Sequence, residues 1–314
     1  MENLLFSLNS TMPVFLLVVL GYFFHRIGWI DDLFASRLNT FTFRVALPFK
    51  VFLDLAVIDF AEAWNLKFVG FCFVVTLLSI LIAVLIALLW KDRSILGEFV
   101  QATYRSSAAI LGIAFITNIY GNSGMAPMMI IGSVPLYNVM AVLVLALMKP
   151  DGEGLSRDTI KKTFRGILTN PILIGIEAGL VWSALSLPMP SILQKLVSNV
   201  GSCATPMGLM AMGATFEFSK AFGRLKPALV ASAMKLMGFG ILFVPLAISM
   251  GFRNQELVAI IVMLGSATTV SSYVMARNMG HEGTLSASVV TITTLFAAVT
   301  LTFWLWLARS LGMI

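Results

Sequence analysis

The sequence predicts an all-α membrane protein in which ten transmembrane helices form two inverted five-helix repeats, with broken crossover helices in spans 4 and 9. Composition is one reason, since 59% of the 314 residues are hydrophobic, 11% are charged and the mean hydropathy is +0.94. Apolar runs of about 20 residues, long enough to cross a bilayer as helices, are another. The two halves also match at an offset of 158 residues, which pairs Pro13 with Pro171, Gly21 with Gly179 and Pro48 with Pro206.

Hydropathy locates the ten expected spans along the chain. They are near residues 11–27, 36–56, 66–90, 98–120, 125–148, 164–186, 192–214, 227–250, 255–278 and 284–311. A cleavable signal peptide is not expected, because residues 1–11 lack a basic segment.

The repeats divide the chain into a first five-span unit, residues 1–148, and a second, residues 164–314. The polar stretch KPDGEGLSRDTIKK begins the connector, residues 149–163. An odd number of spans in each half inserts the second half upside down, which is typical of secondary transporters with a site at the midplane. No phosphate-binding loop motif is present, so ATP-driven pumping by this chain is not expected.

Basic residues are distributed unequally between the two sets of connections. The opposite side holds only Lys67, Lys195, Arg253 and Arg309, and the connections after spans 1, 3, 5, 7 and 9 hold Arg26, Arg37, Lys91, Arg93, Lys149, Arg157, Lys161, Lys162, Arg165, Lys220, Arg224, Lys226 and Arg277. The positive-inside rule then predicts a multi-pass protein of the cytoplasmic (plasma) membrane with both termini outside. Because basic residues are scattered through short loops, a nucleic-acid partner is not expected.

Two prolines occupy matching places in spans 2 and 7. Pro48 lies in RVALPFKVFLDLA (44–56) and Pro206 in CATPMGLMAMGATF (203–216). Each proline removes a helical N–H and displaces the chain from a carbonyl, so we expect a helix break facing protein or a water-lined cavity. The alternative is an ordinary packing kink.

Small residues dominate spans 4 and 9, which read YRSSAAILGIAFITN (104–118) and LGSATTVSSYVMARN (264–278). One interpretation is close helix packing. The other is that both spans are unwound and cross at the midplane, where half-helix N-termini favour an anion. The hydroxyls there belong to Ser106, Ser107, Thr268, Thr269 and Ser271. Neither span contains Asp or Glu, which argues against a cation/proton antiporter.

Charged residues inside spans each need a partner. Lys50 and Asp54 are spaced for an ion pair on one helix face. Arg44 and Arg105 are expected to reach the cytoplasmic interface with long side chains.

Two further charges leave alternatives open. Glu177 and Lys235 either pair with one another across spans 6 and 8, or Glu177 is a proton-coupling carboxylate in a desolvated place. Asn138, in an apolar span after Pro135, requires a hydrogen-bond partner and is expected to hold the crossover spans or line the site.

These motifs together resemble the auxin efflux carrier family of membrane transporters, in particular its bacterial, malonate-transporter-like members, within a superfamily related to bile acid/sodium symporters. The matching stretches are RVALPFKVFLDLA (44–56), IGSVPLYNVMAVLVLALM (131–148), LTNPILIGIEAGL (168–180), CATPMGLMAMGATF (203–216) and TVSSYVMARNMG (269–280). The resemblance implies ten spans in inverted repeats, crossing at spans 4 and 9, and export or exchange of organic acids.

The chain departs from this family pattern at the crossing. Ser107 stands where the family usually has Asn, and Ala114 and Ala267 stand where it usually has Pro, whereas Gly112 and Tyr273 match. The resemblance therefore predicts the fold more firmly than the substrate.

The function expected is secondary transport of small organic anions, namely carboxylates, by alternating access, with spans 1, 2, 6 and 7 moving against spans 3–5 and 8–10. The expected substrate-binding residues are Ser106, Ser107, Gly112, Asn138, Thr268, Thr269 and Ser271. Arg105 is expected to supply positive charge near the cytoplasmic entrance. A membrane-embedded ligand sensor without transport is the alternative. An enzyme is not expected, because no nucleophile–base pair or set of metal ligands is evident.

Other partners follow from composition. Cys72 and Cys203 are expected to be packing residues, and His25 and His281 lie at span ends, so neither a disulfide nor a metal site is predicted. No cofactor is expected. Coupling to H⁺ or Na⁺ is left open, and so is a homodimer within the membrane lipid.

Overall fold

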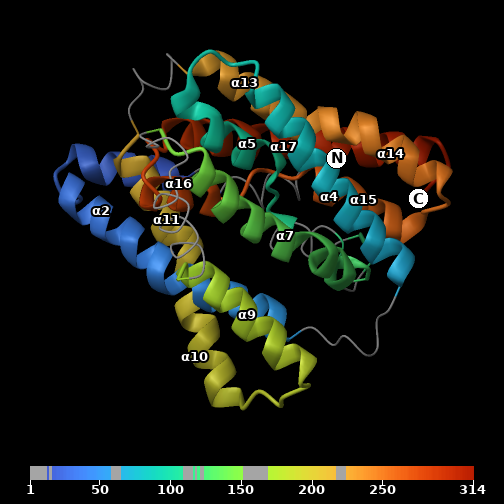
Figure 1. Ribbon diagram of the computed structural model, residues 1–314, viewed down its shortest axis with the longest axis horizontal. Helices are drawn as coiled ribbons and strands as arrows, with labels where there is room; N and C mark the ends of the chain where they lie inside the picture. The colour runs from blue at the N-terminus through green and yellow to red at the C-terminus, as the bar shows by residue number, and fades with distance from the viewer. Residues whose placement is uncertain are drawn as a thin grey trace, which may run out of the picture.

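Helices account for all the regular structure described in the computed structural model (Figure 1). The residues described are 13, 16–57, 65–108, 116, 119–120, 124–150, 169–216 and 224–314. Within these ranges there is no strand, so the all-α prediction is confirmed.

The described helices fall on the apolar runs identified in the sequence. In the first half they are Leu16–Arg26, α2 (Asp32–Phe41), a π-helix (Thr42–Ala46), α3 (Leu47–Ala56), α4 (Leu66–Ala87), a short 3₁₀ turn (Arg93–Ile95), α5 (Leu96–Tyr104) and α7 (Ala126–Leu147). In the second half they are α9 (Pro171–Ala184), α10 (Ser191–Ser202), α11 (Ala204–Ala214), α13 (Leu225–Ala233), a π-helix (Met234–Gly238), α14 (Phe239–Ser249), α15 (Asn254–Gly265), α16 (Ser271–Asn278) and α17 (Thr284–Ser310).

Several of these helices suit a membrane. Within the described residues, four are long and apolar enough to cross one by length and composition, namely Leu66–Ala87, Ala126–Leu147, Leu225–Ser249 and Thr284–Ser310. Shorter apolar helices are Leu16–Arg26, Pro171–Ala184 and Asn254–Gly265. Many leucines and phenylalanines on their outer faces are exposed, as expected for surfaces that face lipid.

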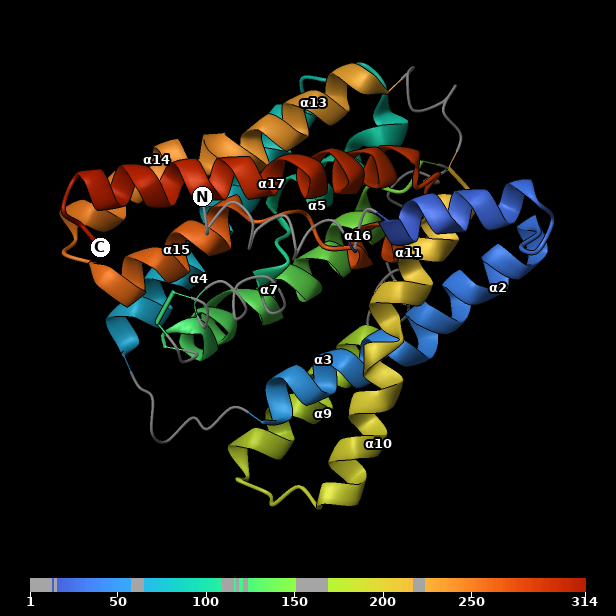
Figure 2. The same cartoon turned by 180° about the vertical axis from the view of Figure 1, so that it is seen from behind.

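The helices pack in two groups. In one, α3 packs against α9 and α10, and α2 packs against α11; Figure 2 shows α3, α9 and α10 together at the edge of the molecule. Glycines make the first contact close, because a Cβ at Gly175 or Gly179 would lie within 3 Å of the carbonyl oxygen of Pro48 or Phe52. In the other group, α4 packs against α5 and α7, α13 against α17, and α14 against α15.

Pro48 and Pro206, which match at the 158-residue offset, have different effects on their helices. The helix is interrupted at Cys203, three residues before Pro206, because α10 ends at Ser202 and α11 begins at Ala204. At Pro48 the chain remains helical, and the π-helix that ends at Ala46 precedes it. The wider π turn accommodates the missing N–H, so the structure has a widened helix where a break was predicted.

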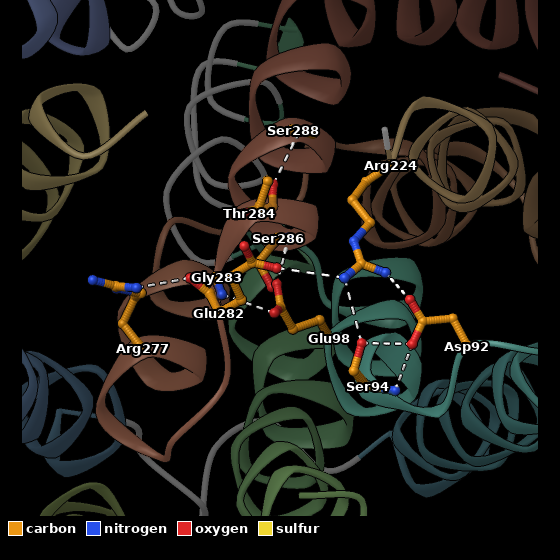
Figure 3. A network of polar contacts seen from close by, with 10 residues as sticks. All are labelled: Asp92, Ser94, Glu98, Arg224, Arg277, Glu282, Gly283, Thr284, Ser286 and Ser288. Atoms are coloured by element: carbon orange, nitrogen blue, oxygen red, sulfur yellow. Dashed lines mark hydrogen bonds and ion pairs between the residues drawn. The ribbon is translucent and has the colours of Figure 1, made fainter. Parts of the chain in front are cut away.

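A buried carboxylate fixes the start of α17. Gly283, the residue before α17, has a left-handed backbone (φ 78°) and no side chain with which to cap the helix. Glu98 of α5 supplies the cap: its Oε1 accepts the Gly283 N–H at 2.8 Å and its Oε2 accepts the Ser286 N–H at 2.9 Å (Figure 3). The arrangement satisfies the same two donors as a capping box, and places a negative charge at a helix N-terminus.

Arg224 ties together three neighbouring connections in the same region. Its guanidinium contacts the carboxylate of Asp92, the Ser94 hydroxyl at 3.4 Å and the Glu282 carboxylate at 3.5 Å (Figure 3). The Ser94 hydroxyl and, secondarily, Arg224 hold the pKa of the Asp92 carboxyl below its usual value. The stabilisation is therefore present at neutral pH and is lost as pH falls through that lowered pKa.

Replacing the cap of α17 provides a test of this helix junction. Glu98→Ala leaves two N–H groups without an acceptor, so we expect a loss of about 1–2 kcal/mol in unfolding free energy, seen as a lower Tm of the detergent-purified protein. Glu282→Ala, which removes an exposed carboxylate nearby, should change it by less than about 0.5 kcal/mol. Equal losses in the two variants would contradict the capping role.

Candidate functional site

Both small-residue spans are interrupted at corresponding places. The first break follows α5, which ends at Tyr104; Arg105 is extended (φ −66°, ψ 140°). The second follows α15, which ends at Gly265; Ser266 is extended (φ −74°, ψ 160°) and α16 begins only at Ser271. Gly112 and Ala114 lie outside the described residues.

The two breaks bond directly to one another. The Ser107 N–H donates to the Ala267 carbonyl at 2.9 Å, and the hydroxyls of Ser106 and Ser266 share a hydrogen bond. Thr268 adds a third link, since its hydroxyl donates to the Ala102 carbonyl at 2.8 Å. These bonds satisfy backbone groups that leave a helix inside an apolar protein, which explains how the chain opens both helices with Ala267 at a position where the family resemblance implies Pro.

Lys235 supplies hydrogen-bond donors to the helix end at the second break. Lys235 is 1% exposed, and its ammonium donates to the carbonyls of Leu264 at 2.8 Å and Met263 at 3.2 Å, in the last turn of α15. A cation at a helix C-terminus is favourable, and these carbonyls have lost their helical donors. Glu177 is exposed on α9, so the pairing of Lys235 with Glu177 is wrong.

Arg105 is the buried cation of the crossing. It is 2% exposed, and its Nη2 donates to the amide oxygen of Asn138 and to the hydroxyl of Ser271, both at 2.7 Å. Its Nη1 faces the sulfur of Met275, and its Nε has no partner. The expectation that Arg105 reaches the interface is wrong, because Asn138 and Ser271 hold it inside.

No carboxylate among the described residues forms an ion pair with Arg105. Burial of an unpaired charge is costly, so this guanidinium is stabilised only by neutral dipoles unless an anion binds. The half-helix α16 begins at Ser271, so its positive N-terminal end adds to the field there.

A small cavity of about 60 Å³ lies beside Arg105, between the two breaks, α3, α7 and α11. The residues predicted from the sequence that line it are Arg105, Ser106, Ser107, Asn138, Thr269 and Ser271. Thr268 does not line it, because its hydroxyl donates to the Ala102 carbonyl. The cavity has room for a few water molecules, which suits a small ligand.

Four polar residues at this cavity were not predicted as site residues. They are Lys50, Asp54, Tyr137 and Thr205. Lys50 and Asp54 form the predicted ion pair, with Nζ 3.0 Å from Oδ2, and so that expectation is confirmed. The signal that could have placed them here was their position just after Pro48, at the point where the two halves match.

A second, larger cavity of about 840 Å³ opens between the two helix groups. Tyr22 and Arg26 line one side, and Tyr273 and Arg277 line the other. The hydroxyls of Thr215 and Tyr273 bond to one another across this boundary. Arg26 and Arg277, which come from the basic connections after spans 1 and 9, both line this cavity, which we call the vestibule.

Comparison with known proteins identifies the family. The profile described as "Membrane transport protein" matches residues 6–305, nearly the whole chain. The chain belongs to this family of membrane transport proteins. It is the family of the auxin efflux carriers, so the resemblance seen in the sequence motifs is confirmed.

Relatives of this membrane transport protein carry transporter names. The chain is 26% identical to a "Putative malonate transporter" of Rhizobium meliloti, over 95% of each chain. It is 20% identical to an "Uncharacterized transporter" of Methanothermobacter thermautotrophicus, over 95% of this chain and 97% of the relative. A further uncharacterised transporter, from Methanocaldococcus jannaschii, is 21% identical over 96% and 98%.

The cap on α15 can be tested by removing the Lys235 ammonium. Lys235→Met keeps the apolar stem but leaves two buried carbonyls without donors, so unfolding should become easier by about 1–3 kcal/mol. The measurement is the Tm of the purified protein. Lys226→Met, on the exposed face of α13 in the same span, is the matched control and should leave Tm nearly unchanged. A Tm for Lys235→Met equal to that of the control would contradict the cap.

Proposed function

We propose that this membrane transport protein is a secondary active transporter that moves small organic anions, specifically carboxylates, across the cytoplasmic membrane by alternating access. The observation that carries the proposal is the buried Arg105 guanidinium, which lines the cavity at the crossing and forms no ion pair with any described residue. A carboxylate matches the geometry of a planar guanidinium, and the Nε of Arg105 has no other partner among the described residues.

The polar residues around Arg105 support an anionic ligand. Ser107 and Thr269 are only partly covered and present hydroxyls at the cavity. The N-terminus of α16 points its positive end to the same place. The nonhelical residues 105–107 and 266–270 contain no Asp or Glu with which to bind a cation. The relative named "Putative malonate transporter" agrees with a carboxylate substrate.

The contacts at the crossing also support the ten-span inverted repeat. In two copies related by a twofold axis, equivalent residues meet near that axis. Ser106 and Ser266 bond to one another, and so do Ser107 and Ala267; each pair is 160 residues apart, within two residues of the 158-residue offset between the halves. We therefore propose that residues 1–148 and 164–314 are the two repeats, with the crossing at the midplane.

Alternating access would use the two helix groups as moving bodies. The cavity at Arg105 lies at their boundary, because α3 and α11 belong to the first group and α7 to the second. Helix α16 contacts helices of both groups, and we assign it to the second body because it belongs to span 9. With both termini outside, the vestibule of about 840 Å³ faces the cytoplasm. The structure would then be a state open toward the cytoplasm.

Removing the guanidinium should abolish anion binding. A ligand present at 100 times its Kd raises stability by about 2.7 kcal/mol, so malonate should raise the Tm of the purified wild type and malonamide should not. Arg105→Gln should lose the malonate shift, and Arg105→Lys should retain part of it, because an ammonium lacks the planar fork. Arg44→Gln, an exposed arginine on the π-helix, is the matched control. A full malonate shift in Arg105→Gln would contradict the proposal.

Joining the two bodies should stop transport. Asn278 of α16 donates to the Asn39 carbonyl of α2 at 3.3 Å, so cysteines at these positions can be bridged by a short bifunctional thiol reagent. In a chain whose Cys72 and Cys203 are replaced by alanine, bridging should abolish malonate flux into liposomes. Cysteines at Asp92 and Arg224, both within one body, should bridge without that loss. Undiminished flux in the first bridged protein would exclude relative motion of the bodies.

A further inference from the structure

An ion pair faces Arg105 across the small cavity. Lys50 and Asp54 stand one turn apart on α3, with Nζ 3.0 Å from Oδ2 and 3.2 Å from Oδ1; both line this cavity, and each side chain is 24% exposed. Arg105 comes from the opposite body, at the end of α5. A ligand in the cavity therefore meets two cations and one carboxylate.

No other charged group among the described residues lines this cavity. The elements packed against α3 carry Glu177 on α9, Lys195 on α10 and Arg44 on the π-helix, and all three are exposed and outside the lining. Tyr137 and Thr205 add only neutral hydroxyls. The charge of the empty cavity thus comes from Lys50, Asp54 and Arg105, and amounts to one positive charge.

This charge determines which ligands leave the cavity neutral. A monocarboxylate neutralises it directly. A dicarboxylate brings one negative charge too many, and an uncompensated charge in a water-poor place is strongly disfavoured. The excess vanishes if one carboxylate in the cavity takes a proton, and Asp54 is the only carboxylate among the described lining residues.

We propose that Lys50 is a second anion ligand and Asp54 the proton-coupling carboxylate, so that a dicarboxylate crosses the membrane together with one proton. The inference rests on the proposed function of the Arg105 cavity. One substrate carboxylate binds Arg105, and the other displaces Asp54 from Lys50. Asp54 takes its proton from water on the side to which the cavity is open. When the substrate leaves on the opposite side, Asp54 returns the proton to water there and pairs with Lys50 again.

The Lys50–Asp54 ion pair also has a role when no substrate is bound. While no substrate is bound, Asp54 occupies the place of the second substrate carboxylate and keeps Lys50 neutralised. The carrier then moves the same net charge with either class of substrate, namely one negative charge. A dicarboxylate is accompanied by a proton and a monocarboxylate is not.

The test measures protons and substrate together in liposomes containing the purified full-length protein. The probes are malonate, which is doubly charged at neutral pH, and malonamate, its monoamide, which is singly charged and of nearly the same shape. Radiolabelled uptake and an internal pH dye give the ratio of protons to substrate. For the wild type we expect one proton with each malonate and none with each malonamate.

Variants assign the proton to Asp54. Asp54→Asn should reduce the proton ratio for malonate to zero, whereas Asp54→Glu should restore it. Lys50→Gln should raise the KM for malonate by about tenfold or more and affect malonamate much less. Glu177→Gln, an exposed carboxylate outside the cavity, is the control and should keep the wild-type ratio.

Each outcome is decisive. Absence of flux for both probes in the wild type would overturn the proposed function. Malonate flux without protons in the wild type would overturn this inference alone. One proton with each malonate in Asp54→Asn would show that the substrate itself carries the proton, and would also overturn it. If the Asp54 variants do not fold, Lys50→Gln decides, because equal KM changes for the two probes would exclude Lys50 as the second ligand.

Discussion

The crossing of residues 105–107 with residues 266–270 depends on an exchange of hydrogen bonds between two broken helices. Peptide groups released from a helix within an apolar interior must find partners in protein, since lipid offers none. Here the Ser107 N–H donates to the Ala267 carbonyl and the Thr268 hydroxyl donates to the Ala102 carbonyl. The Lys235 ammonium donates to the Leu264 carbonyl at the end of α15. Because these partners come from the protein itself, Arg105 can be held between Asn138 and Ser271, with its charge available to a ligand.

Much of the fold could be predicted, because it follows from local patterns. Apolar runs of helix length predict where helices lie, and the Lys50 and Asp54 spacing predicts their ion pair. The effect of Pro48 could not be read in the same way. A proline interrupts regular α-helical bonding, but whether the chain breaks or widens depends on the neighbouring turn, and here the π-helix of residues 42–46 absorbs the change.

The site was predictable in its composition and less so in its geometry. Runs of small hydroxyl residues predict a polar interruption, and Ser106, Ser107, Thr269 and Ser271 do line one cavity. The local sequence does not determine how deeply a side chain is buried, so Arg105 was expected at the interface. Its hydrogen bond to Asn138, 33 residues along the chain, holds it inside the protein. Likewise Lys235 suggested a carboxylate partner, whereas its partners are carbonyls exposed only once α15 ends. Such contacts depend on tertiary packing, which periodicity does not report.

The pairing of Ser106 with Ser266 also constrains how the protein is made. The two serines are 160 residues apart, so at ordinary rates of synthesis roughly ten to thirty seconds separate their emergence from the ribosome. During that interval the first half contains an open helix end and a guanidinium with neither Ser271 nor the second break present. Neither half of the chain supplies all the partners of the crossing. We therefore expect the crossing to remain incompletely packed until the second half has been inserted.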